Sequence, residues 1–412
     1  MLTMVSRRAF TLSPALLALA RRARAADLPP VRAITKPPGF HWFGYYDKLQ
    51  FDPSSRYALG MRVGFEHRSP RPDDVIRIGM VDTEDGDRWL DLGESRAWNW
   101  QQGCMLQWVP GYSEEVAWND VEDGHFVARV KNVKTGRTRT LPAPFYALSP
   151  DGKEGVAPDF RRLNDCRPGY GYAGIPDPNR DKLVPEDAGI WRIDMRSGKS
   201  NLIISFAAAQ RIPYPGGYSE GAKHWFNHLL YNTDGSRFIF LHRWRGTKEG
   251  KAGFSTRMFT ASREGKDLYI LEPHGQTSHF IWRDPQHVLA WAWHPSHKMK
   301  FYLYKDKTEE VQPVGPDVMT VNGHCTYLPG GRYILNDTYP DKERNQNVYL
   351  YEIATGRRIP LGSFHSPREY TGEWRCDTHP RYSPDGRKVV IDSPHGGNGR
   401  QMYLIDLGAL LA

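Results

Sequence analysis

Short alternating runs of apolar and polar residues, separated by turn residues, recur seven times along the chain. Each copy reads as a short strand, a turn of the Asp-Gly type and a second, more apolar strand. The copies are "DKLQFDPSSRYALG" from Asp47, "MLQWVPGYSEEVAWN" from Met105, "FYALSPDGKEGVAPD" from Phe145, "HLLYNTDGSRFIFL" from His228, "HFIWRDPQHVLAW" from His279, "HCTYLPGGRYILND" from His324 and "HPRYSPDGRKVVID" from His379. Serial copies of one fragment indicate a repeat architecture.

A further pair of strands follows several copies, as in "GIWRIDMRSGKSNLI" and "NVYLYEIATGRRIPL", where a turn of the Asp-x-x-Thr/Ser-Gly type, with Glu for Asp in the second, joins two apolar runs. Each unit then holds four strands and recurs at roughly 40 to 60 residues, the period of propeller blades. The sequence therefore predicts an all-β fold, a seven-bladed β-propeller with four-stranded antiparallel blades, over residues 26–412. Two β-sandwiches are the alternative, which the regular serial order disfavours.

The third unit is interrupted by residues 159–189, "DFRRLNDCRPGYGYAGIPDPNRDKLVPEDAG", which are rich in Pro, Gly, Arg and Tyr. A loop this long inside a compact domain is usually functional. We interpret it as a lid over one mouth of the central channel.

The 412 residues carry a formal net charge of +8, which fits either an acidic partner or a modestly basic solvated surface. No Lys/Arg run of the kind found in nucleic-acid-binding arms is present, so we expect no nucleic acid partner. The 13 Trp, 21 Tyr and 17 Phe, together with 39 Gly, favour a β-rich protein with many turns. We expect a monomer.

The N-terminal segment "SRRAFTLSPALLALARRARAA" has the features of an export signal. The pair Arg7 and Arg8 precedes an apolar stretch, and Ala23-Arg24-Ala25 forms an A-x-A-like cleavage site. We therefore expect a twin-arginine-type signal peptide over residues 1–25 and a bacterial protein that is periplasmic or secreted. The apolar run is too short for a permanent membrane anchor.

Two familiar motifs lack the context that their chemistry needs. "GYGYAG" at residues 169–174 matches a dinucleotide-binding fingerprint, but no strand leads into it and no helix opens after it. "GYSEG" at residues 217–221 matches a nucleophile elbow, yet no α/β domain surrounds it. Both are rejected.

Histidines stand at the same position in the last four copies: His228, His279, His324 and His379. The first strand of each propeller blade lines the channel, so residues in equal register form a ring. One such histidine alone is more often a satisfied strand cap. Four in register, with Cys376 three residues before the last, favour a metal site, and imidazole with thiolate suits zinc.

The repeats and the last blades resemble the oligogalacturonate lyases and the related ulvan and rhamnose-glucuronate lyases, which are seven-bladed propellers. In oligogalacturonate lyases a divalent metal is held by a histidine that opens one blade and a Gln-x-x-His-x-His cluster on the last. "TSHFIW" supplies His279, and "CDTHPR" matches the cluster with Cys376 for the glutamine, His379 kept and Arg381 for the last histidine. These departures favour zinc over manganese or calcium, with the ligands His279, His324, Cys376 and His379.

The resemblance implies β-elimination on a uronic-acid-containing polysaccharide or oligosaccharide. That reaction needs a cation to neutralise the uronate carboxylate, a base for the C5 proton and an acid for the leaving oxygen. His228 stands where oligogalacturonate lyases carry a functionally important histidine. We expect His228, His242, Tyr172 and Arg243 to be catalytic, and Arg167, Tyr170, Arg245 and Trp100 to bind substrate.

Each of these residues has a plainer interpretation. Tyr172 and Tyr170 could pack the lid on the propeller, His242 could be a loop histidine, and Trp100 could hold blades together. The metal could orient substrate or only pin the last blades, and a cysteine ligand favours the structural role. The rival function is a non-catalytic periplasmic propeller, a TolB-like scaffold or glycan-binding module. A glycoside hydrolase would need two carboxylates flanking a cleft, for which Asp47, Asp165 and Glu220 are the candidates.

Overall fold

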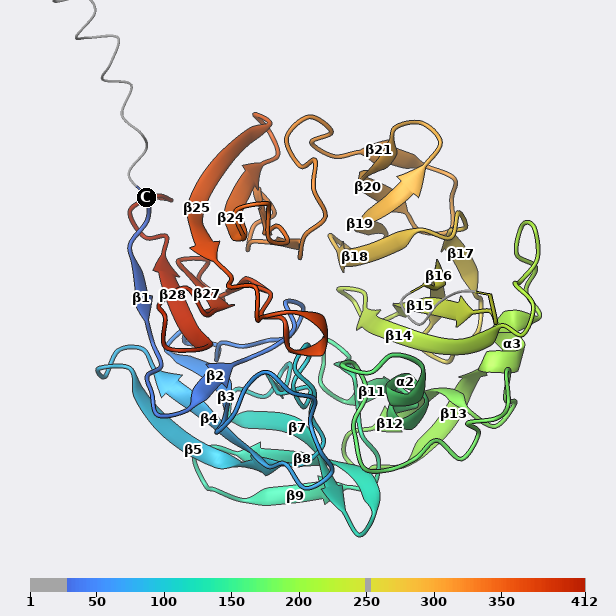
Figure 1. Ribbon diagram of the computed structural model, residues 1–412, viewed down its shortest axis with the longest axis horizontal. Coiled ribbons are helices and arrows are strands. Elements are labelled where there is room, and N and C mark those ends of the chain that lie inside the picture. The colour runs from blue at the N-terminus through green and yellow to red at the C-terminus, as the bar shows by residue number, and fades with distance from the viewer. Residues whose placement is uncertain (1–27, 249–252, 412) are drawn as a thin grey trace, which may run out of the picture.

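Seven four-stranded antiparallel sheets are arranged in a ring around a central channel (Figure 1). The computed structural model describes residues 28–248 and 253–411. It confirms the seven-bladed β-propeller predicted from the repeats. The segment expected to be the signal peptide, residues 1–25, lies outside the described residues.

The first three blades follow the chain from the inner strand outward. The first blade contains β2 (Phe40–Trp42), β3 (Tyr57–Val63), β4 (Ile76–Asp82) and β5 (Arg88–Ser95). The second contains β6 (Gln107–Trp108), β7 (Glu115–Glu122), β8 (His125–Asn132) and β9 (Thr138–Leu141). The third contains β10 (Ala147–Leu148), β11 (Glu154–Pro158), β12 (Gly189–Asp194) and β13 (Ser200–Ser205).

The next three blades repeat this order. The fourth contains β14 (Lys223–Tyr231), β15 (Arg237–Arg245), β16 (Ser255–Ser262) and β17 (Tyr269–Glu272). The fifth contains β18 (Thr277–Trp282), β19 (His287–His294), β20 (Lys298–Lys305) and β21 (Val311–Pro313). The sixth contains β22 (Thr326–Tyr327), β23 (Tyr333–Asn336), β24 (Asn345–Glu352) and β25 (Arg357–His365).

The last blade is completed by the other end of the chain. Its three inner strands are β26 (Arg381–Tyr382), β27 (Lys388–Ser393) and β28 (Gln401–Asp406), and its outer strand is β1 (Val31–Ala33). Val31 lies opposite Ile405 in the β1–β28 ladder. The sequence repeat ends after three strands in this unit, and the strand from the N-terminal side closes the ring.

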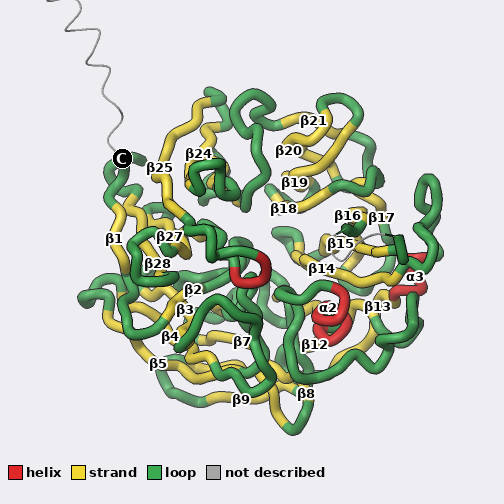
Figure 2. The backbone as a smooth tube through the Cα atoms, in the orientation of Figure 1, coloured by secondary structure: helices red, strands yellow, loops and turns green. Residues whose placement is uncertain are grey.

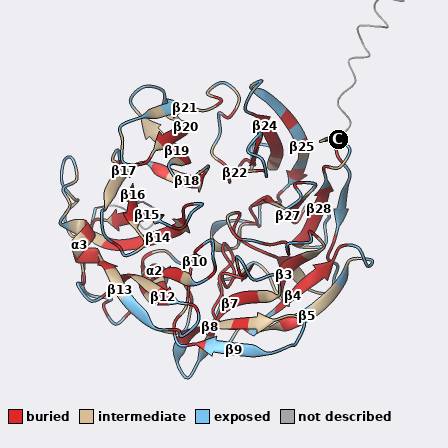
Figure 3. Ribbon diagram, turned by 180° about the vertical axis from the view of Figure 1, so that it is seen from behind, coloured by how far each residue is buried: buried red, intermediate tan, exposed pale blue. Residues whose placement is uncertain are grey.

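The blades pack face to face through apolar side chains, because alternate residues of each strand point to opposite faces of its sheet. The inner and middle strands are mostly buried, whereas outer strands such as β9 and β25 carry exposed residues (Figure 3). No helix in the described ranges is long and apolar enough to cross a membrane.

The expected lid is partly helical, which corrects its interpretation as a plain loop. α2 (Phe160–Cys166) lies beside the centre of the ring, while α3 (Phe206–Gln210) lies at the rim and a 3-10 turn, η1 (Gly372–Trp374), precedes the last blade (Figure 2). Asp159 caps α2 by accepting from the backbone N–H groups of its first turn. Arg162 is fully buried and donates to the carbonyl oxygens of His224, Asn179 and Leu183, which fixes the insertion onto the fourth blade.

Candidate active site

Breaks in strand pairing turn four histidines toward the channel. The ladder between β14 and β15 skips a step at His228, whose φ is +51°, and the ladder between β18 and β19 skips a step at His279. His324 and His379 each come two residues before the inner strand of their blade, and His379 has a φ of +39°. These positions are free of sheet pairing, so the rings can face the axis.

Three of the histidines form a contiguous cluster. The ring centroid of His324 lies 4.2 Å from that of His279 and 4.2 Å from that of His379. All three side chains are buried. Burial and the neighbouring His324 lower the pKa of both His279 and His379 well below the usual value, so both rings are neutral.

Second partners orient two of these rings. Oδ1 of Asp337 lies 2.9 Å from Nδ1 of His324, and Oδ1 of Asn322 lies 3.0 Å from Nδ1 of His279. Each Nδ1–H donates to its oxygen, which leaves Nε2 as the ring nitrogen with a lone pair. Nε2 of His379 is buried and has no hydrogen-bond partner among the described residues.

A carboxylate completes the cluster. Ligand atoms of His324, Asp377 and His379 all lie within 4.8 Å of one another, and all three residues are buried. Oδ2 of Asp377 is 4.0 Å from Nε2 of His379. Two imidazole nitrogens and a carboxylate oxygen, with His279 beside them, make a donor set that fits a divalent transition metal.

Cys376 lies outside this group, which corrects its expected role as a ligand. Residues two apart in an extended segment share a side, so Asp377 and His379 point together and Cys376 points away. Its thiol is buried, and burial raises the thiol pKa far above its usual value. The charge of Arg400 lowers this pKa, but by less than burial raises it. The group of ligand atoms that lie close together does not include the Cys376 thiol.

His228 lies near this cluster, with Tyr45 in contact with both His228 and His379, and it sits in a polar and aromatic cage. The Tyr45 ring stacks on it at 5.0 Å, and its Nδ1 is 3.1 Å from the Tyr146 hydroxyl and 3.1 Å from Nε2 of Gln102. Burial, followed by the charge of Arg243, lowers the pKa of His228 well below its usual value. Because an amide nitrogen only donates, Nδ1 accepts from Gln102, and Nε2, 3.4 Å from the Tyr45 hydroxyl, carries the proton of the neutral ring. The lone pair that can accept a further proton is therefore on Nδ1.

Two arginines near His228, the buried Arg243 and the partly buried Arg167, have no carboxylate partner within the described ranges. Arg167 and Arg243 stack on the Phe254 ring at 4.6 and 4.9 Å, and Nη1 of each is buried without a hydrogen-bond partner. Burial, and then the charge of Arg167, lowers the pKa of Arg243 to about 9. Buried cations are ordinarily paired, so this pair of guanidinium groups can receive an anion.

Tyr170 contacts both Arg167 and His228. Its ring centroid is 5.6 Å from that of His228 and 4.3 Å from Cζ of Arg167. Its hydroxyl accepts a 2.7 Å hydrogen bond from Nη2 of Arg375. Burial alone would raise the pKa of Tyr170, but the charges of Arg375 and Arg167 outweigh it and lower the pKa below its usual value.

Tyr172 is placed away from this group, against the expectation of a catalytic role. It is fully buried between the second and third blades, stacked on Phe160 at 4.2 Å. Its hydroxyl accepts a hydrogen bond from Asn119, and burial raises its pKa far above the usual value. The packing interpretation therefore holds for Tyr172.

His242 is likewise turned from the channel, because it precedes Arg243 on β15 and neighbouring residues of a strand face opposite sides. Its Nε2 lies 2.8 Å from Nδ1 of His224, and Arg257 donates to its Nδ1 at 3.2 Å. The structure gives His242 a packing position rather than access to the channel.

Trp100 and Arg245 also serve the framework. Trp100 is buried, its indole N–H donates to the Arg68 carbonyl, and the Arg400 guanidinium lies 4.3 Å from its ring. Arg245 donates to the carbonyl oxygens of Gly253 and Cys166.

The three carboxylates of the hydrolase alternative each pair with a lysine: Asp47 with Lys48, Asp165 with Lys223 and Glu220 with Lys248.

Sequence reasoning missed Asp377 and Arg375. Both lie in the fragment that carries His379, and the spacing 375, 377, 379 is the period that puts extended residues on one side. The strand period is therefore a usable signal for this group, whereas residue type alone favours Cys376 and His379. No sequence signal marked Tyr45, which reaches His228 from the first blade.

Comparisons with known proteins bear on the fold. No family model matches the chain, and no curated protein matches it. Among solved structures, an oligogalacturonate lyase in complex with manganese aligns with a TM-score of 0.65 at 16% identity, covering 94% of this chain and 96% of that one. An oligogalacturonate lyase from Vibrio parahaemolyticus aligns with a TM-score of 0.66 at 13% identity, covering 94% and 96%. The propeller thus resembles theirs over almost its whole length.

Proposed function

We propose that this protein is a polysaccharide lyase that cleaves a uronic-acid-containing glycan by β-elimination, with a divalent metal ion in the central channel. The observation that carries the proposal is the meeting of His228, Tyr170 and the pair Arg167 and Arg243 beside a cluster of metal-ligating side chains. The likeness in fold to two oligogalacturonate lyases supports it.

The arginine pair would bind the uronate carboxylate. A guanidinium group matches a carboxylate with two parallel N–H donors, and both Nη1 atoms are without other partners in the described chain. Withdrawing charge from the carboxylate makes the C5–H more acidic. Because Arg243 is almost fully buried, its charge is little screened by water.

His228 and Tyr170 would share the proton transfers. His228, neutral and able to accept, takes the C5 proton; the electron pair forms the C4–C5 double bond and the C4–O bond breaks. Tyr170, whose pKa is lowered by two arginines, gives its proton to the departing oxygen. The lowered pKa of Tyr170 favours its role as the acid. The lowered pKa of His228 makes it a weaker base than free imidazole, so the proposal relies on the arginine pair to acidify the C5–H.

The residues present fit a divalent ion. His324, His379 and Asp377 would hold it, with His279 adjacent, and Asp337 would orient His324. The ion would supply positive charge next to the bound uronate. We propose zinc, now on imidazole and carboxylate donors in place of a thiolate, while manganese suits the same donors.

The proposed location is the periplasm or the exterior of a bacterial cell, which the arginine pair and the A-x-A-like site of the N-terminal sequence support. The four cysteines are free and buried.

The test is a cleavage assay on polygalacturonate, ulvan, glucuronate-bearing arabinogalactan and glycosaminoglycans, following the ultraviolet absorbance of the unsaturated product. We expect the absorbance to rise on one substrate, and His228→Ala should lower the rate of this rise ~100-fold or more. His242→Phe should leave the rate per folded molecule unchanged. A flat trace across the panel from folded, metal-loaded protein would favour the non-catalytic glycan-binding propeller.

A further inference from the structure

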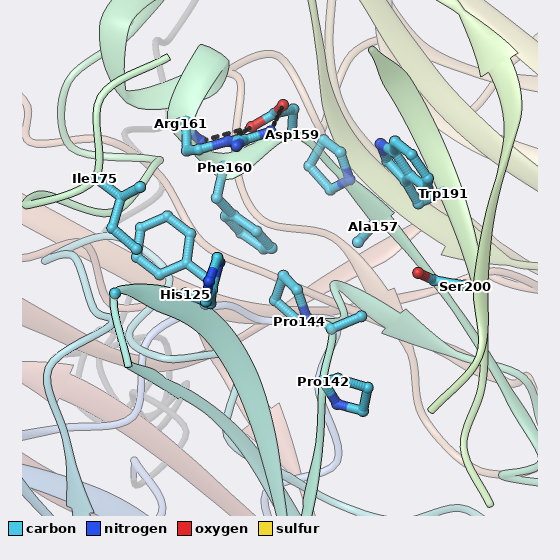
Figure 4. A pocket seen from close by; sticks show the side chains of 14 residues that line it. His125, Pro142, Pro144, Ala157, Asp159, Phe160, Arg161, Ile175, Trp191 and Ser200 are labelled. Atoms are coloured by element: carbon cyan, nitrogen blue, oxygen red, sulfur yellow. Dashed lines mark hydrogen bonds and ion pairs between the residues drawn. The ribbon is translucent and has the colours of Figure 1, made fainter. Parts of the chain in front are cut away.

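A pocket of about 220 Å³ lies between the second and third blades. In Figure 4, Trp191 of β12 and Ser200 of β13 line one side of it, and His125 of β8 and Ile175 of the insertion face them. Asp159 and Arg161 lie along an edge at the start of α2. None of these six residues belongs to the proposed active site.

Aromatic and proline rings make up the apolar part of the pocket lining. Phe126 and Phe160 contribute aromatic rings, and three prolines, Pro142, Pro144 and Pro158, contribute ring carbons. Trp191 is partly exposed, so its indole face remains available. Flat aromatic surface beside aliphatic ring carbons is suited to one apolar face of a small ring-shaped ligand.

The rim is polar but nearly neutral. Nε and Nη2 of Arg161 donate to the two carboxylate oxygens of Asp159 at 2.9 and 2.7 Å, so this guanidinium is already paired. His125 and Ser200 are exposed and offer an imidazole and a hydroxyl group. A ligand with hydroxyl groups can hydrogen-bond to such a rim, whereas a carboxylate finds no unpaired cation there, because Arg161 is already bound to Asp159.

The pocket adjoins the channel through shared residues. Phe160 lines the pocket, and its ring centroid lies 6.3 Å from that of Tyr146, whose hydroxyl is 3.1 Å from Nδ1 of His228. The insertion also contributes to both places, since Arg161 lines the pocket and Tyr170 lies in the channel. Phe160 and Tyr146 are buried, so they join the two places by packing, and a glycan that occupies both has to pass over the insertion.

We propose that this pocket binds a neutral sugar residue of the glycan, distant from the bond that is cleaved, with the sugar ring stacked on Trp191. The volume is below that of a site for a drug-sized ligand and suits a single ring. The inference rests on the proposed function for its glycan, and it assigns the substrate to mixed glycans in which neutral sugars accompany uronates.

Ligand-observed saturation-transfer NMR tests the pocket without any cleavage. The probes are methyl galactoside, methyl rhamnoside and methyl galacturonoside, each with the mature full-length protein. We expect saturation transfer to a neutral glycoside. In Trp191→Ala this transfer should fall about fivefold, because the aromatic stacking surface is lost. Trp191→Phe should retain most of it, because it keeps a stacking ring. His125→Ala, at an exposed position, should weaken it if Trp191→Ala fails to fold.

Trp293→Ala is the matched control, since Trp293 is a partly exposed tryptophan of the fifth blade that packs on His274. It should leave the transfer unchanged. The assignment of the pocket as a sugar site would be wrong if neither neutral glycoside shows transfer, or if transfer persists in Trp191→Ala. Either result would count even if uronates are cleaved. Trp191-dependent binding without cleavage of any glycan would retain the pocket as a sugar site and remove only the lyase proposal.

Discussion

The guanidinium of Arg375 donates a 2.7 Å hydrogen bond from Nη2 to the hydroxyl of Tyr170. Through Nε it also lies 2.7 Å from Oδ2 of Asp377. One side chain thus joins the insertion of the third blade to the ligand-bearing segment of the last. The proposed proton donor and the proposed metal site are held in one network.

Removing the hydroxyl of Tyr170 should affect chemistry and leave folding intact. Tyr170→Phe should lower kcat at least ~100-fold with little change in Tm, because it deletes the proposed acid. Tyr172→Phe should keep kcat and cost about 1 kcal/mol of stability, because it deletes only the bond to Asn119. Steady-state kinetics and thermal melts of both variants measure this, and an equal loss of kcat in Tyr172→Phe would contradict the assignment.

The charge of Arg375 should set the alkaline limb of the pH–rate profile. An acid must be protonated, so activity falls as pH rises through the pKa of Tyr170. Arg375 lowers that pKa, so Arg375→Gln should raise it and move the alkaline limb to higher pH. The profile of kcat against pH decides this; a limb that stays in place would exclude Tyr170 as the titrating acid.

Metal content should depend on Asp377 and be independent of Cys376. Asp377→Ala and His379→Ala each remove an atom of the ligand group and should lose bound metal on dialysis. Asp337→Asn should weaken binding roughly 10–100-fold by releasing the orientation of His324. Elemental analysis by mass spectrometry gives the stoichiometry. Cys376→Ser is the matched control, and loss of metal in that variant would restore the cysteine as a ligand.

Arg243 should lower stability in the absence of substrate. Its charge is buried and its Nη1 has no partner in the described structure, so Arg243→Met should be neutral or raise the free energy of unfolding. The same change should abolish cleavage, because the carboxylate clamp is lost. Urea unfolding together with the cleavage assay tests both, and a strongly destabilised variant would argue against an unpaired arginine.

The metal-free protein should lose stability in acid. Burial lowers the pKa of His228, His242, His279 and His379, so the folded state keeps these rings neutral. Below about pH 6.5 the unfolded chain binds protons that the folded chain does not. Each ring therefore lowers the free energy of unfolding by up to ~1.4 kcal/mol per pH unit. Urea unfolding at pH 7.5 and 5.5 measures the slope. His242→Phe should make it shallower.

The sequence by itself determined the ring of blades and the side of it, toward the channel, on which the four histidines lie. The strand period, the turn residues and the seven serial copies specify which neighbouring strands pair within each blade. These local pairings are enough to specify a propeller, because each blade packs only on the blades next to it. The alignment of His279, His324 and His379 followed from the register of the repeats. The strand that closes the ring, β1, carried no repeat signal and pairs with β28 from the far end of the chain.

Only the tertiary structure decided which neighbours of those histidines take part. Whether Tyr170 or Tyr172 faces His228 depends on how α2 packs, and Arg162 fixes that packing through carbonyl groups remote in sequence. Asp377 is selected over Cys376 by the direction of one extended segment. Residue type and spacing state what chemistry is available; side-chain direction and burial, which arise from long-range packing, determine which residues perform it.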